Sequence, residues 1–301
     1  MFCCDDKAKV KVGEPGCPVS TGVRGRESIT SRDTTLVALD HDMVKATLTP
    51  SVVLQVKLKD NASPDDSFVR GKVTTTINDT VFSRSSPFRH ALMLARVMQR
   101  DGVPNIALKY TDGGTDQRNT LEAVKCANIC LFKELSLDMI ITVRCAPGQS
   151  FLNPAERVMS ILNYGLQNCA TERQVQDEST ESILKRCNST VAIREQAKKT
   201  PALKEKWQES IKPVQEVIRG RFQRLKLKEE PIADLQPLND VEIEAFQRHL
   251  VEFPLLKLDK LNKAESKKCK AYMDWKARHC RETQYTFQVS TIRSSSLNLY
   301  L

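Results

Sequence analysis

Three acidic residues in the first 160 positions stand where carboxylates can do chemistry. Apolar residues lead into Asp5, Asp112 lies just past the strand expected at 105–110, and Glu156 lies beside Pro154 at an expected helix start. Carboxylates that converge repel one another, and divalent cations such as Mg²⁺ or Mn²⁺, which prefer oxygen ligands, relieve that repulsion. Two ions about 4 Å apart activate a water or hydroxyl and stabilise the leaving oxygen in phosphoryl transfer. The three acids therefore predict a two-metal site if the fold brings them together.

Each acid also has a purely structural interpretation. Asp112-Gly113-Gly114 is a typical turn sequence, and Glu156 would complement a helix dipole. Asp5 could be a solvated acid near the start of the chain. The order of elements is more specific than any one residue, because it runs strand-acid, helix, strand-acid, helix, strand, helix-acid.

The predicted elements alternate between strands and helices. Ser86 is a suitable N-cap, Pro87 suits the first helical position, and Gly102 ends that helix. Strands are expected at 1–12, 36–39, 52–58, 69–77, 105–110 and 139–143, and further helices at 120–135 and 154–168. Because alternation implies crossover connections, we expect an α/β fold with a mixed sheet flanked by helices.

The pattern changes near residue 170. Residues 171–301 hold 25 basic and 19 acidic residues and predict a mainly helical, basic extension that packs against or extends from residues 1–170. Asn239 or Asp240 is a suitable cap for one of its helices, whereas Pro213 should kink or interrupt another.

Two motifs carry a family resemblance. The segments Tyr110-Thr111-Asp112-Gly113-Gly114-Thr115-Asp116 and Ser150-Phe151-Leu152-Asn153-Pro154-Ala155-Glu156-Arg157 resemble the second and third acidic motifs of DDE transposases, especially the mariner-like and related insertion-sequence groups. Asp5-Asp6-Lys7-Ala8-Lys9, followed by Val12-Gly13, resembles the first motif. The 43 residues between Asp112 and Glu156 make a somewhat wider spacing than in compact mariner-like proteins.

The resemblance implies a ribonuclease-H-like catalytic domain over residues 1–170, with Asp5, Asp112 and Glu156 as catalytic ligands of two Mg²⁺ or Mn²⁺ ions. Asp6 is the rival for the first position, since adjacent strand residues face opposite sides and only one can point into the site. Transposases of this type carry a helix-turn-helix region before the first acidic strand. The chain begins four residues before Asp5, so we expect that region to be missing.

The family implies metal-dependent cleavage and strand transfer of DNA, a homodimer, and a nuclear location, or a cytosolic one for a remnant without a nuclear signal. A transposase remnant could instead persist as a non-catalytic DNA- or protein-binding module. A ribonuclease-H-like nuclease unrelated to transposition is a further alternative. Strand-transfer products would separate the two enzymes.

Basic residues are candidates for phosphate contacts. They are Lys7, Lys9 and Arg157 beside the acids, and Arg219, Arg221, Arg224, Lys226 and Lys228 in the tail. The alternative is a solvated helix face, since acidic residues are interspersed through the tail. A content of 40% hydrophobic and 28% charged residues is typical of a globular protein. No apolar run long enough for a membrane span or a secretory signal is present, so we expect reduced cysteines and no secretion.

Overall fold

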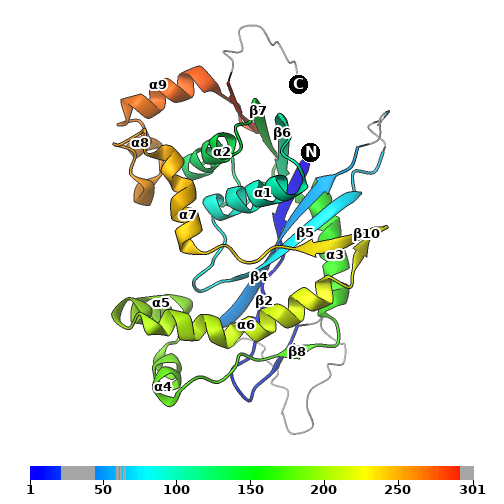
Figure 1. Cartoon of the computed structure of the whole chain (residues 1–301), viewed down its shortest axis with the longest axis vertical. Helices are drawn as coiled ribbons and strands as arrows, with labels where there is room; N and C mark the ends of the chain where they lie inside the picture. Colours follow the sequence, from blue (N-terminus) through cyan, green and yellow to red (C-terminus); the bar gives the residue numbers. More distant parts are fainter. Residues whose placement is uncertain (22–44, 59–60, 62, 64–65, 292–301) are drawn as a thin grey trace.

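A mixed β-sheet with helices against both faces organises the chain (Figure 1). The computed structural model describes residues 1–21, 45–58, 61, 63 and 66–291, and the strand expected at 36–39 lies outside them. The described strands are β1 (Phe2–Asp6), β2 (Val10–Val12), β3 (Val19–Ser20), β4 (Ala46–Val56), β5 (Gly71–Asp79), β6 (Ile106–Thr111), β7 (Met139–Arg144), β8 (Ala170–Thr171), β9 (Lys226–Leu227), β10 (Glu230–Asp234), β11 (Cys280–Glu282) and β12 (Thr286–Ser290).

The main sheet runs in the order β11-β12-β7-β6-β1-β4-β5-β10-β9, and β2 also pairs with β4. Strand β1 is antiparallel to β4 and parallel to β6, and β6 is parallel to β7. The expected mixed α/β sheet is confirmed at this level. Strand β1 lies inside the sheet, so its side chains are covered on both faces.

Helices connect these strands as the sequence predicted. The described α-helices are α1 (Pro87–Asp101), α2 (Glu122–Glu134), α3 (Pro154–Leu166), α4 (Glu178–Arg186), α5 (Thr190–Lys199), α6 (Ala202–Phe222), α7 (Asp240–Gln247), α8 (Lys263–Ser266) and α9 (Lys270–His279). Short 3₁₀ turns are η1 (Ser150–Leu152), η2 (Arg248–Leu250) and η3 (Leu258–Lys260). Ser86 caps α1 through its side chain and Asn239 caps α7, as expected.

Two hydrophobic cores lie on opposite faces of the sheet. Phe2 and Cys4 of β1 belong to the core with α1, α2 and parts of α7 and α9, whereas Cys3 belongs to the core with α3 and α6. Because side chains alternate along a strand, Asp6 follows Cys4 toward α1, and Asp5 follows Cys3 toward α3. The fold thus separates two adjacent acids onto two faces.

The segment after residue 170 is not only helical. Its strand β10 pairs in parallel with β5, and its strand β12 pairs antiparallel with β7. The division at residue 170 therefore stays a prediction, and the sheet runs across it. Pro213 lies inside α6, which continues over 21 residues, so of the expected kink or interruption the interruption is wrong and the kink stays a prediction. No helix among the described residues is long and apolar enough to cross a membrane.

Candidate metal centre

Asp5 and Asp112 lie at the ends of two neighbouring parallel strands. Cys4 of β1 is in register with Thr111 of β6, so Asp5 and Asp112 are the next residues on each strand. Gly113 adopts a positive φ of 83°, which turns the chain away from β6 at no steric cost to glycine. The main-chain N–H of Gly114 donates to Oδ1 of Asp112 over 2.9 Å and holds the carboxylate at the turn.

Glu156 reaches the same region through the cap of α3. Asn153 is fully buried, and its side-chain oxygen accepts a hydrogen bond from the N–H of Ala155. Its side-chain amide donates to the main-chain oxygen of Cys4 over 3.1 Å, which ties the start of α3 to β1. Pro154 occupies the first helical position, where its missing N–H costs nothing. Glu156 is therefore placed in the first turn of a helix anchored beside Asp5.

The charges of Asp112 and Glu156 both act on the Asp5 carboxylate. Burial raises the pKa of Asp5 to about 8, and the charges of Asp112 and Glu156 contribute to the same shift. Asp5 is 6% exposed and accepts a hydrogen bond from the N–H of Asp6. Within the described chain, no lysine or arginine forms an ion pair with any of the three. An uncompensated buried carboxylate of this kind favours a cation or a proton.

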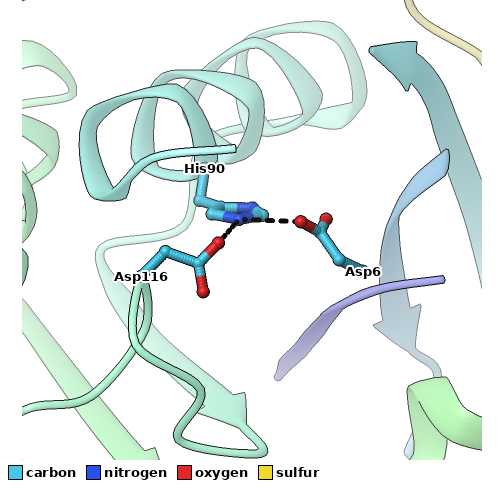
Figure 2. Close-up of side chains that lie close together, drawn as sticks. All are labelled: Asp6, His90 and Asp116. Atoms are coloured by element: carbon cyan, nitrogen blue, oxygen red, sulfur yellow. Dashed lines mark hydrogen bonds and ion pairs between the residues drawn. The ribbon is translucent and has the colours of Figure 1, made fainter. Parts of the chain in front are cut away.

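A second cluster lies on the other face of β1, and sequence analysis did not predict it. Nε2 of His90 on α1 lies 2.7 Å from Oδ2 of Asp116 and 3.4 Å from Oδ2 of Asp6, as Figure 2 shows. Ser51 donates to Asp6 over 2.5 Å, and Ser85 donates to its other oxygen. The Thr-Asp ending of the second motif contained Asp116, but no local signal linked it to a histidine 26 residues earlier.

This cluster is a tight electrostatic unit. Burial lowers the pKa of His90, but the carboxylates of Asp6 and Asp116 outweigh it and raise that pKa to about 10. The pKa values of Asp6 and Asp116 are both lowered. Burial raises each of them, but interactions with His90 lead the effects that outweigh burial. The imidazolium therefore joins the two aspartates when no metal ion is bound.

The two sets of acids differ in compactness. One ligand atom from each of Asp6, His90 and Asp116 lies within 4.8 Å of the other two, and this trio could hold a metal ion. No other His, Cys, Asp and Glu trio in the described chain is that compact, so Asp5, Asp112 and Glu156 are spaced more widely. The outer ligands of a two-metal site serve different ions and need not approach so closely.

The sets meet at Gly114. A Cβ atom added there would lie 3.4 Å from both carboxylate oxygens of Asp112 and 3.5 Å from Oδ1 of Asp116. The carboxylates of Asp112 and Asp116 therefore both lie close to Gly114.

The three basic residues beside the acids that were predicted to contact phosphates differ in their surroundings. Lys7 donates to Oδ1 of Asn163 over 2.6 Å, and the Glu156 charge acts on its ammonium. Lys9 and Arg157 are exposed. Burial lowers the pKa of Lys7, and the charge of Glu156 opposes that shift.

The five basic residues at the end of α6 do not form one free surface. Arg219 pairs with Glu216 and Asp234, and Arg221 donates to the main-chain oxygens of Gly165 and Gln167. The remaining three, Arg224, Lys226 and Lys228, are exposed. Two of the five therefore already bind groups within the protein.

Comparisons of the chain with protein families, with curated proteins and with solved structures found no match.

Proposed function

We propose that the chain contains a ribonuclease-H-like, DDE-transposase-type site that uses divalent metal ions to cleave DNA phosphodiesters and transfer strands. The fold supports this proposal through the placement of the acids. Asp5 lies on the inner strand β1, and Asp112 follows the adjacent parallel strand β6. Glu156 lies in the first turn of α3, which follows β7 along the chain. That is the order that the family resemblance implies.

The observation that carries the proposal is the convergence of the ends of β1 and β6 with the start of α3, where burial also raises the pKa of Asp5. A carboxylate with a pKa of about 8 is largely protonated at neutral pH, because its surroundings are acidic and buried. Fixing three acids around one point destabilises the protein unless a ligand compensates for it. Divalent cations supply that compensation, and a set of carboxylates suits Mg²⁺ or Mn²⁺.

Asp5, Asp112 and Glu156 would hold the ions. Bound there, two ions would activate a water or hydroxyl nucleophile and stabilise the leaving oxygen. The chain itself contributes the positioning: Asn153 fixes Glu156 against β1, and the turn at Gly113 fixes Asp112. Lys7, on which the charge of Glu156 acts, would contact a phosphate of the DNA strand.

The test is incubation of the purified protein with supercoiled plasmid and with labelled oligonucleotides, in Mn²⁺ or in EDTA. Cleavage should require Mn²⁺ and should fall at least about a hundredfold in Asp112→Asn, since one ligand is lost. Asp138→Asn is the matched control, because Asp138 is exposed at the start of β7.

Cleavage that survives Asp112→Asn would assign the activity to another site or a contaminant. A protein that binds DNA but neither binds Mn²⁺ nor cleaves would be a non-catalytic binding module. Joined products, as opposed to nicks alone, would distinguish strand transfer from simple hydrolysis.

A further inference from the structure

Asp6, His90 and Asp116 converge from three separate parts of the fold. Asp6 ends β1, His90 lies in the first turn of α1, and Asp116 lies in the loop after β6 (Figure 2). A ligand atom of each lies within 4.8 Å of the other two, which is close enough for one ion to contact all three.

The three side chains differ in their exposure to solvent. The His90 side chain is 5% exposed, whereas those of Asp6 and Asp116 are 21% and 27% exposed. The imidazole thus lies at the buried end of the site, and the carboxylates remain accessible to an ion from solvent. The hydroxyls of Ser51 and Ser85 orient Asp6 from behind, and such supporting hydrogen bonds typically orient metal ligands.

We propose that Asp6, His90 and Asp116 bind one divalent transition-metal ion, of the Zn²⁺, Mn²⁺ or Co²⁺ class, at a site distinct from Asp5, Asp112 and Glu156. The imidazole decides the class of metal, because imidazole suits transition ions, whereas Mg²⁺ and Ca²⁺ favour sites made of oxygen ligands alone. The proposal does not depend on the proposed DNA chemistry, since the two sites share no ligand.

A proton is the competing occupant. In the metal-free protein Nε2 of His90 lies between the carboxylates of Asp6 and Asp116, 3.4 Å and 2.7 Å from their Oδ2 atoms. An entering ion releases the His90 proton to solvent and takes its place between the carboxylates. The site is therefore compact before metal binds, and binding needs little rearrangement.

The ion would also connect the elements that carry the other acids. Asp6 is adjacent to Asp5, and Asp116 lies four residues after Asp112. One ion would therefore tie α1 to the ends of β1 and β6 and fix the spacing of Asp5 and Asp112 indirectly.

Histidine NMR under Co²⁺ titration at pH 8 tests this site directly, because paramagnetic Co²⁺ shifts the signals of a bound imidazole. The protein has four histidines, and only His90 belongs to either set of acids. In the full-length protein labelled at histidine, one imidazole should shift with saturable, one-to-one stoichiometry. Zn²⁺ should compete with Co²⁺ at least tenfold better than Mg²⁺.

Three variants assign the signal. Asp116→Asn and His90→Gln should abolish the shifted resonance, whereas Asp112→Asn should keep it. A wild-type spectrum without a shifted histidine, or a shift that persists in Asp116→Asn, would overturn the proposal. A wild-type spectrum without a shifted histidine decides the matter even if a variant does not fold. Loss of DNA cleavage in Asp112→Asn with the Co²⁺ shift intact would show that the two sites are independent.

Discussion

The side-chain amide of Asn153 donates to the main-chain oxygen of Cys4 over 3.1 Å, so the residue that caps α3 also binds β1 immediately before Asp5. This bond gives the Asn-Pro-x-Glu motif a physical role. The asparagine ends the preceding loop, the proline begins the helix, and the glutamate, three residues after the asparagine, lies in the first turn. A motif that looks like a helix start is also a link between two acids.

Replacement of Asn153 by alanine should lower the free energy of unfolding by about 1–3 kcal/mol, because a buried helix cap and a bond to β1 are both lost. Urea unfolding measures the change. Asn262→Ala is the control, since Asn262 caps the short helix α8 at an exposed position. Equal, small losses in both variants would show that the bond to Cys4 contributes nothing.

Neutralising Asp5 should stabilise the metal-free protein. The pKa of Asp5 is raised by burial to about 8, so its contribution to stability is greatest below pH 4 and is lost as the pH rises through 8. At pH 7.5 in EDTA, Asp5→Asn should therefore gain about 1 kcal/mol or more. Asp138→Asn should change stability by less than about 0.5 kcal/mol. A destabilised Asp5→Asn variant would contradict the crowding of acids around this residue.

His90 should give the protein a second pH dependence. Burial lowers its pKa, but Asp6 and Asp116 raise it to about 10, so its stabilising effect is complete below about pH 6.5 and disappears as the pH passes 10. Unfolding free energies measured in EDTA should fall over this window. The fall should be shallower in His90→Gln, which cannot become a cation. Identical slopes in the two proteins would mean that the imidazolium does not bridge the aspartates.

The basic residues after α6 should separate into two groups. Replacing Arg224, Lys226 and Lys228 by glutamine should reduce the slope of log K for duplex DNA binding against log salt concentration by about 2 to 3. This holds if these exposed side chains contact phosphates. Arg221→Gln should instead lower stability, because Arg221 donates to two main-chain oxygens. A salt slope unaltered by the triple replacement would assign this segment to the scaffold.

Local signals in the sequence predicted the elements that carry the three acids. The cap Ser86 depends on a hydrogen bond within a few residues, and the apolar run of β7 is short and continuous. These features are visible without tertiary structure. Long-range pairing is not, and so β10 and β12 were missed: each is five residues long and is stabilised by a partner strand far away in the chain.

The second acidic cluster was missed for the same reason. Alternation along β1 predicted that Asp5 and Asp6 would face opposite sides, but it did not say what Asp6 would meet. His90 reaches it only because α1 packs on that face. The continuity of α6 through Pro213 also depends on packing, since Ile211 and Val214 on either side of the proline are buried.

Carbon-13 NMR of the aspartate carboxyls, with Asp5 assigned by comparison with Asp5→Asn, tests the central claim most directly. Without metal, the Asp5 carboxyl should titrate near pH 8. With saturating Mg²⁺ the midpoint should fall by several units, because bound cations replace the proton as the partner of the acids. A midpoint that Mg²⁺ leaves unchanged would contradict a metal site at Asp5, Asp112 and Glu156.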